Sequence, residues 1–116
     1  MKGQKMIARV WKGTTLEKDT ETYLQYLEET GLKDYRKTEG NLGVQLLLKT
    51  EDGISEFVII SLWDSFDSIR KFSGKNINKA RYYPKDKKYL LKLEPNVTHY
   101  TVANFLGIKT DNSKCC

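Results

Sequence analysis

The stretch "EFVIISLWDSFDSIRKF", residues 56–72, changes its periodicity at a single tryptophan. Up to Trp63 it is almost continuously apolar and rich in β-branched side chains, which is typical of a buried strand. Beyond Trp63, Asp64 or Ser65 can cap a helix whose apolar face and terminal glycine follow at helical spacing: Phe66, Ile69, Phe72 and Gly74. The stretch predicts a strand that runs directly into a helix. Trp63 is then either the last core residue of the strand or the wall of a site for a planar molecule.

A second apolar run lies just before this strand. It reads "GVQLLLKT" over residues 43–50, and the pair Asp52-Gly53 separates it from "ISEFVIISLW" at 54–63. An Asp-Gly pair between two strand-like runs is a hairpin turn signal. We expect the two strands to be antiparallel neighbours.

The rest of the chain supplies two more strands and further helix. "MIARVW", residues 6–11, predicts a first strand, and Thr14 and Glu17 form a T-x-x-E capping box before a helical pattern over about 16–30 that Gly31 ends. "VTHYTVANF", residues 97–105, predicts the last strand. Between them we expect short helical turns in a basic segment interrupted by a proline.

This order predicts the α+β class, with a ferredoxin-like β-α-β-β-α-β antiparallel sheet and helices on one face. The strand at 54–63 has apolar residues on both of its faces, and helices cover only one. A second, two-fold related copy of the sheet is the simplest cover for the other face. The sequence therefore predicts a homodimer in the form of a dimeric α/β barrel.

Composition indicates one domain. The chain has 116 residues, of which 39% are hydrophobic and 30% charged, enough for one core and too few for two. We expect a domain over 1–106 and a flexible C-terminal tail over 107–116. No apolar run approaches the roughly 20 residues of a membrane span and none resembles a signal peptide, so we expect a cytoplasmic protein with no membrane partner. Cys115 and Cys116 are adjacent, cannot staple the fold, and are a weak match to a prenylation signal.

The net charge of +5 is concentrated in residues 75–92, where tyrosines lie among lysines. Basic residues with aromatic neighbours can bind nucleic acid, but lysines far outnumber arginines here, which favours a solvated connection. The strand at 54–63 also lacks the glycine and aromatic pattern of RNA-recognition domains. We expect no nucleic-acid partner.

Three stretches resemble the antibiotic biosynthesis monooxygenase (ABM) family of dimeric α+β barrels. They are "MIARVWKG", "SLWDSFDSIRKFSG" and "ARYYPKDKKYLLKLEPNVTHY", and the resemblance covers roughly residues 6–105. It implies one of three roles: cofactor-free oxygenation of quinols or anthrone-like polyketides, haem degradation, or no catalysis.

The haem-degrading branch of that family fits poorly. Its pattern has an asparagine in the first strand, a tryptophan within the second helix and a histidine soon after it. Here Ala8, Arg9 and Val10 occupy the strand, Phe72 the helix position, and Arg81 or Tyr82 the region of the histidine. None of the three matches, so haem becomes the minor alternative.

Side chains of like parity on the first, third and last strands share a face of the sheet. One set, Arg9, Trp11, Ser61, Trp63, His99 and Thr101, predicts a mixed polar and aromatic cavity. The other, Ala8, Val10, Val58, Ile60, Leu62, Tyr100 and Val102, predicts the core under the helices. A register slip of one residue would exchange the faces, and if Trp63 packs under the helices instead, the predicted site fails.

Each residue of the cavity set has a catalytic and a structural interpretation. His99 can act as a base near neutral pH and Arg9 can stabilise an oxyanion, or His99 is a hydrogen-bonded structural residue and Arg9 pairs with Glu56 or Glu94. Substrate-binding walls are expected from Trp11, Trp63, Ser61, Tyr82 and Tyr83, with core or interface packing as the alternative for the tryptophans.

Other enzyme classes lack their motifs. The chain contains no G-x-S-x-G elbow, H-E-x-x-H helix, C-x-x-C pair or dinucleotide fingerprint, and its single histidine disfavours a conventional metal site. We expect no tightly bound cofactor and no metal. Two hypotheses remain: a monooxygenase acting on a small aromatic, quinol or polyketide-like substrate, and a non-catalytic dimeric barrel that binds a small hydrophobic ligand.

Overall fold

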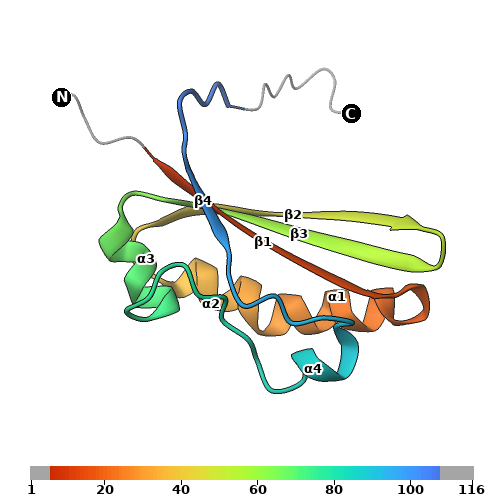
Figure 1. Cartoon of the computed structure of the whole chain (residues 1–116). Coiled ribbons are helices and arrows are strands. Elements are labelled where there is room, and N and C mark those ends of the chain that lie inside the picture. The colour runs from red at the N-terminus through yellow and green to blue at the C-terminus, as the bar shows by residue number, and fades with distance from the viewer. Residues whose placement is uncertain (1–5, 108–116) are drawn as a thin grey trace.

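The computed structural model describes residues 6–107 as a four-stranded antiparallel sheet with helices on one face (Figure 1). The sheet order is β2-β3-β1-β4. Its strands are β1 (Ile7–Leu16), β2 (Asn41–Glu51), β3 (Ile54–Trp63) and β4 (Thr98–Thr101). The helices are α1 (Thr20–Glu29), α2 (Gly31–Lys37), α3 (Phe66–Ser73) and α4 (Asp86–Tyr89), with a 3₁₀ turn at Glu17–Asp19. The predicted α+β, ferredoxin-like class is confirmed.

The junction between β3 and α3 is as predicted. β3 ends at Trp63, and the Ser65 hydroxyl accepts a hydrogen bond from the Ser68 N–H at 3.1 Å, which satisfies one of the free donors at the start of α3. Gly74 ends the helix with φ +93°. The Asp52-Gly53 hairpin is also confirmed, since both residues have positive φ.

The start of the first helix was predicted wrongly. β1 continues to Leu16 because it pairs over ten residues with β3, and Thr14 lies in this ladder opposite Glu56. Thr14 therefore does not cap a helix; a 3₁₀ turn follows, in which the Thr20 hydroxyl donates to Glu17 O at 2.7 Å. β4 is shorter than the predicted 97–105.

The helix predicted to end before Gly31 does end there, at Glu29, but Gly31 then begins a second helix. The backbone turns at Thr30, with φ −117° and ψ −88°, and the Thr30 hydroxyl donates to Tyr26 O at 2.7 Å. The chain then resumes as α2, which buries Tyr35. The prediction used glycine as a stop signal and so placed Tyr35 outside any helix.

The two sets of strand residues are grouped as predicted, but their faces are exchanged. The set with Arg9 and Trp63 lies under the helices, and the set with Val10 and Ile60 lies on the open face. Helices α1 to α3 contribute large side chains to the core that contains the tryptophans, and the smaller aliphatic residues of the strands lie on the open face. The helix residues are Tyr23, Tyr35, Ile69 and Phe72. Alternation defines such sets but does not say which one the helices cover.

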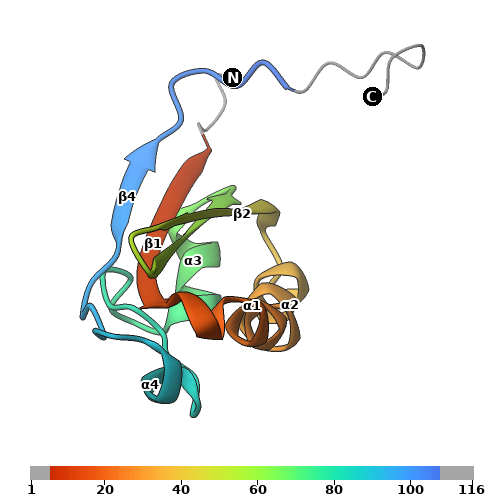
Figure 2. The same cartoon turned by 90° about the vertical axis from the view of Figure 1, so that its right-hand side faces the viewer.

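Residues 74–97, called the strap below, run from α3 through α4 to β4 on the helix side of the sheet (Figure 2). Its two ends are joined by an antiparallel bridge between Lys79 and Asn96. Leu91 N–H donates to Thr14 O of β1 at 2.9 Å, and the neighbouring Leu90 is buried. The strap closes the side of the domain where β1 and β4 meet the helices.

No helix within residues 6–107 is long and apolar enough to cross a membrane. Cys115, Cys116 and all of the predicted tail except Gly107 lie outside the described residues.

Candidate functional site

Arg9 lies at the centre of the candidate site. It sits on β1 opposite Ser61 of β3 and His99 of β4, and its side chain is 1% exposed. Its Nη1 donates to Ile77 O at 2.6 Å and its Nη2 to Lys79 O at 3.1 Å, both in the strap. The guanidinium therefore ties the strap to the sheet through neutral carbonyl groups.

Arg9 has no carboxylate partner within residues 6–107. The predicted alternative of a pair with Glu56 or Glu94 is wrong, because Glu56 is on the open face of β3 and Glu94 pairs with Lys92 at 3.2 Å. Burial lowers the pKa of the Arg9 guanidinium and Tyr35 partly opposes this. The pKa of an arginine is ordinarily far above neutrality, so Arg9 remains a buried cation, and no carboxylate in the part of the chain that the structure describes is paired with it.

His99 contacts this cation directly. Arg9 Nη1 lies 3.3 Å from His99 Nε2, and a guanidinium can only donate, so Nε2 accepts and the neutral ring carries its proton on Nδ1. Burial, followed by the positive charge of Arg9, lowers the pKa of His99 below its usual value of 6.5. His99 is thus held in its basic, neutral form.

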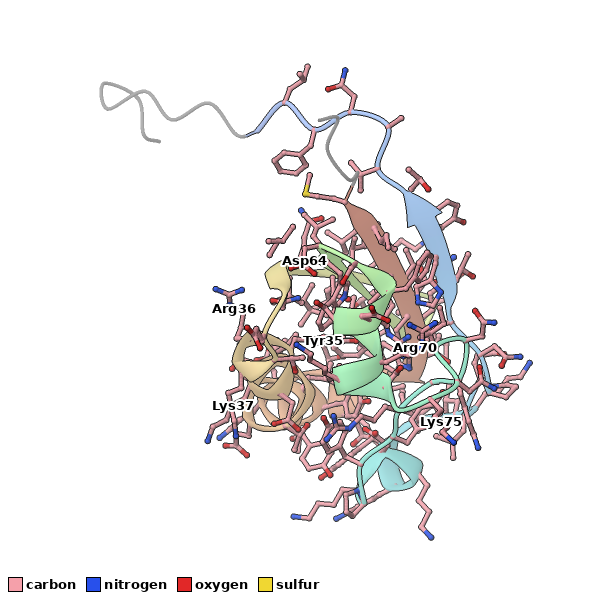
Figure 3. All side chains as sticks on the ribbon, turned by 90° about the vertical axis from the view of Figure 1, so that its left-hand side faces the viewer. Tyr35, Arg36, Lys37, Asp64, Arg70 and Lys75 are labelled. Atoms are coloured by element: carbon pink, nitrogen blue, oxygen red, sulfur yellow. The ribbon has the colours of Figure 1, made fainter. Side chains whose placement is uncertain are left out.

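Aromatic rings from two helices and β3 surround the guanidinium. Tyr35 of α2 stacks on Phe72 of α3 with ring centroids 4.3 Å apart, and the Arg9 Cζ lies 5.7 Å from the Phe72 centroid. Figure 3 shows Tyr35 directed toward α3, whereas Arg36 and Lys37 point away from the domain. Burial raises the pKa of the Tyr35 phenol, and Arg9 followed by Ser61 opposes this rise.

Trp63 packs completely within this aromatic group. It is 0% exposed, its ring centroid lies 6.0 Å from that of Phe72, and its Nε1 donates to Ser61 Oγ at 2.8 Å. Because Trp63 is under the helices, the predicted cavity with Trp63 as an accessible wall is not present. Trp63 and Ser61 instead form the floor beneath Arg9 and Tyr35.

A small cavity of about 20 Å³ lies between the sheet, α1, α2 and the strap. It is lined by Arg9 and Trp11 of β1, by Tyr35 and Phe72, by Tyr23 and Gly31, and by strap residues Arg81, Tyr83 and Asp86 among others. This space is enough for one water-sized group and too small for an aromatic substrate. The described conformation therefore has no room in this cavity for such a substrate.

Strap residues Arg81 and Tyr83 form one wall of this cavity. Arg81 Nη2 and the Tyr83 hydroxyl both donate to Asp34 Oδ2 of α2, at 3.1 and 2.7 Å. The Arg81 guanidinium also lies over the rings of Phe72 and Tyr83, 4.9 and 5.0 Å from their centroids. These contacts fasten the strap to α2 and α3.

Asp86 fastens the strap to α1. Its carboxylate is 3% exposed and accepts from the Tyr23 hydroxyl at 2.8 Å and from Tyr83 N–H at 2.6 Å. Burial raises the pKa of Asp86, and these two hydrogen bonds oppose the rise. The carboxylate is committed to holding α1 and the strap together.

The structure brings together some of the predicted site residues and separates others. Arg9, Trp11 and Tyr83 line the cavity, whereas His99 and Ser61 contact Arg9 but do not line the cavity. Tyr82 packs edge-on against Trp11 with centroids 6.4 Å apart, and its hydroxyl donates to Glu94 O, so it does not line the cavity. Sequence reasoning assigned no site role to several cavity residues, namely Tyr23, Tyr35, Phe72 and Asp86. The i, i+3 spacing of Leu32 and Tyr35 after Gly31 was the available signal for Tyr35.

Comparisons with known proteins place the fold. No protein-family model matches the chain, and no curated protein matches it. Solved structures do match. The putative antibiotic biosynthesis monooxygenase from Bacillus cereus matches with a TM-score of 0.59 at 19% identity, over 90% of this chain and 99% of that one. Its counterpart from Nitrosomonas europaea gives 0.62 at 12% identity, over 92% and 98%.

The chain has the ABM-like fold. Protein SO0527 from Shewanella oneidensis also matches, with a TM-score of 0.63 at 15% identity, over 87% of this chain and 96% of that one. The resemblance stated from the sequence is confirmed at the level of the fold. At these identities the likeness concerns architecture and does not assign a reaction.

Proposed function

We propose that this protein is an ABM-like oxygenase that acts on a small aromatic, quinol or polyketide-like molecule without a tightly bound cofactor. The observation that carries the proposal is the buried Arg9 cation, which has no carboxylate partner within the described chain and lies beside a neutral histidine. Such a cation stabilises negative charge far better in a water-excluded site than in solvent. The ABM-like fold supports the same class of activity.

The proposed reaction needs an anion to form and be held. A quinol or hydroxyanthrone loses a proton, and the resulting electron-rich anion reduces dioxygen. One oxygen atom enters the ring or methylene carbon, and the other leaves as water together with two hydrogens of the substrate. Substrate and dioxygen supply all the atoms and electrons of this balance, so no external reductant is required.

The site residues have distinct roles in this proposal. Arg9 binds the substrate oxyanion, and a substrate oxygen that takes this contact releases His99 Nε2 to accept a proton. Trp11 and Tyr83 contact the substrate rings, with Tyr82 supporting Trp11 from the strap. Ser61 and Trp63 are hydrogen-bonded to each other and pack beneath Arg9, which helps to hold Arg9 in position. Substrate enters after the strap moves, because the closed cavity admits no ring.

A dioxygen-uptake screen tests the proposal. The full-length protein is mixed with a series of quinols and hydroxyanthrones, and products are weighed by mass spectrometry after reaction under ¹⁸O₂. We expect enzyme-dependent uptake with at least one compound and one ¹⁸O atom in its product. Absence of uptake with every compound, for protein shown to be folded, contradicts the proposal. A haem titration runs alongside, and a sharp Soret change at one haem per chain would favour the haem-degrading alternative.

The closed cavity favours a second candidate function. Tyr35, Phe72 and Trp63 pack so completely that the same fold can serve as a stable, non-catalytic module that binds a small hydrophobic ligand. An apolar hollow on the open face of the sheet, between Leu42, Leu62 and Phe105, is a place for such a ligand. A folded protein that takes up no dioxygen but binds an apolar fluorescent probe would select this candidate.

We also propose a homodimer formed through the open face. Figure 1 shows every helix on one side of the sheet, and the other side carries Val10, Val58, Ile60 and Leu62, which no part of residues 6–107 covers fully. Tyr100 on the same face is 59% exposed. A contiguous apolar sheet face of this kind marks an interaction surface, and a two-fold related copy covers it with its own apolar face.

A further inference from the structure

We propose that Tyr23 and Asp86 form a redox-active pair, in which Tyr23 gives one electron to an oxygen-centred radical and passes its phenolic proton to Asp86. The Tyr23 hydroxyl donates to Asp86 Oδ1 at 2.8 Å, and both residues line the cavity beside Arg9. Tyr23 is 0% and Asp86 3% exposed. The proposed oxygenation gives neither this buried phenol nor this buried carboxylate a part in the reaction.

Asp86 is a buried carboxylate whose hydrogen bonds come from neutral donors. Its Oδ1 accepts from the Tyr23 hydroxyl, and its Oδ2 accepts from Tyr83 N–H at 2.6 Å. No lysine, arginine or histidine forms an ion pair with it in the part of the chain that the structure describes. Burial raises the pKa of Asp86, so its carboxylate accepts a proton more readily than an exposed one.

A tyrosine that loses an electron must also lose its proton, because the phenol radical cation is a very strong acid. In the pair, one electron leaves the Tyr23 ring for the oxidant, the phenolic O–H bond breaks, and Asp86 Oδ1 takes the proton. The products are a neutral phenoxyl radical, a neutral carboxylic acid and the reduced oxidant. The pair thereby loses its buried negative charge, and the low polarity of its surroundings favours that change.

Tyr83 provides a comparison within the same wall of the cavity. Its hydroxyl also donates to a carboxylate, at 2.7 Å from Asp34 Oδ2. Asp34 is partly exposed and is paired with Arg81, and a neighbouring cation disfavours protonation of a carboxylate. Of these two phenols, Tyr23 therefore has the better proton acceptor and is the one that is oxidised more easily.

Ring contacts connect Tyr23 with the surface of α1 and α4. The Tyr23 centroid lies 5.7 Å from that of Tyr89 and 6.2 Å from that of Tyr26, and these two lie 6.3 Å apart. Tyr26 and Tyr89 are both partly exposed. Aromatic rings in contact exchange electrons readily, so Tyr23 can reduce a radical in the cavity that it lines or one at this surface.

Photo-oxidation followed by electron paramagnetic resonance tests the pair. The full-length protein is mixed with tris(bipyridine)ruthenium(II) and persulfate, illuminated briefly and frozen. The chain has seven tyrosines, so ring-deuterated tyrosine identifies the radical type and variants assign the residue. We expect a long-lived tyrosyl radical in the wild-type protein and loss of most of it in Tyr23→Phe. Its formation should slow in D₂O, because the proton moves with the electron.

The variant Asp86→Asn separates proton acceptance from packing. It keeps an oxygen that can accept from Tyr23 but removes the base, so we expect the yield of the radical to fall severalfold. The matched controls at the neighbouring pair, Tyr83→Phe and Asp34→Asn, should give the wild-type yield. Circular dichroism checks the fold of each variant. If Asp86→Asn does not fold, Tyr23→Phe and the effect of D₂O still decide.

Several results would overturn the proposal. They are a wild-type protein without a long-lived tyrosyl radical, a radical that persists at full yield in Tyr23→Phe or in folded Asp86→Asn, formation at equal rates in H₂O and D₂O, and an equal loss of the radical in Tyr83→Phe. The ruthenium complex supplies the oxidant and no substrate is present. The failure of this proposal is therefore distinguishable from the failure of the proposed function.

Discussion

Arg9 and His99 are direct partners across two strands, and their protonation states are coupled. The guanidinium donates to His99 Nε2, and a proton on that nitrogen would set two cations against each other. Burial adds to this cost, so the pKa of His99 is lower than in an unfolded chain. His99 is the only histidine, which makes its titration simple to observe.

We predict that the His99 ring titrates with a midpoint below 6.5 in the folded protein. Below the unfolded pKa the unfolded chain binds more protons than the folded one, so the free energy of unfolding falls as pH decreases from 6.5 toward the folded pKa. NMR of the single imidazole and denaturant unfolding at several pH values measure both effects. His99→Gln keeps an acceptor for Arg9 and should remove this part of the pH dependence. A midpoint above 6.5 would show that the contact with Arg9 does not persist in solution.

Among the helices, strands and turns, the sequence patterns that predicted the structure correctly are local ones. The Asp52-Gly53 turn and the Ser65 cap each depend on a few neighbouring residues, and the structure has both. The extension of β1 to Leu16 depends on pairing with β3, which is distant in the sequence, and the local capping pattern at Thr14 gave no sign of it. Pairing with another strand therefore determined the structure at the place where the local capping pattern predicted it wrongly.

The backbone at Gly40, in the turn between α2 and β2, lies very close to α3. Its φ is +93°, and a Cβ there would lie 2.0 Å from Ser68 Oγ. Gly74 has the same φ with nothing within 4 Å of such an atom. We predict that Gly40→Ala lowers the free energy of unfolding by about 1–3 kcal/mol more than Gly74→Ala does, because both strain the backbone and only the first overpacks. Equal losses in denaturant unfolding would mean that Ser68 yields freely.

The strap is fastened to α2 largely through one carboxylate. Asp34 receives both Arg81 and Tyr83, and its side chain is partly exposed. We predict that Asp34→Asn speeds hydrogen exchange of strap amides such as Leu91 and Val97 by a few-fold, because a partly exposed ion pair contributes about 0.5–1 kcal/mol. Asp67→Asn, at the exposed pair with Arg70, is the matched control. Equal exchange in both variants would show that Asp34 does not hold the strap.

For the whole molecule, the sequence identified the two faces of the sheet but not which one the helices cover. The two strand sets, the sheet order and the apolar open face follow from alternation and topology. Whether Trp63 lay under helices depended on α2, whose Tyr35 was not predicted to be helical. The candidate site was therefore predicted from the right strand residues and lacked the helix and strap residues that enclose it.

We predict that the protein runs as a dimer in light scattering coupled to size exclusion, at about twice the 13.5 kDa mass of the chain. Ile60→Glu places a charge on the open face and should give a folded monomer, whereas Glu28→Lys on the exposed face of α1 should remain dimeric. A wild-type protein that is a monomer at all concentrations would contradict the predicted dimer and leave the open face free for another partner.

In the proposed reaction, Arg9 holds the substrate anion that reacts with dioxygen. To test this role, dioxygen uptake with a compound that the wild-type protein oxidises is compared between Arg9→Lys and the surface control Arg70→Lys, both checked for native fold. We predict a loss of on the order of a hundredfold in kcat for Arg9→Lys, since a removed oxyanion donor costs about that much, and wild-type activity for Arg70→Lys. Equal activity in the two variants would contradict the claim.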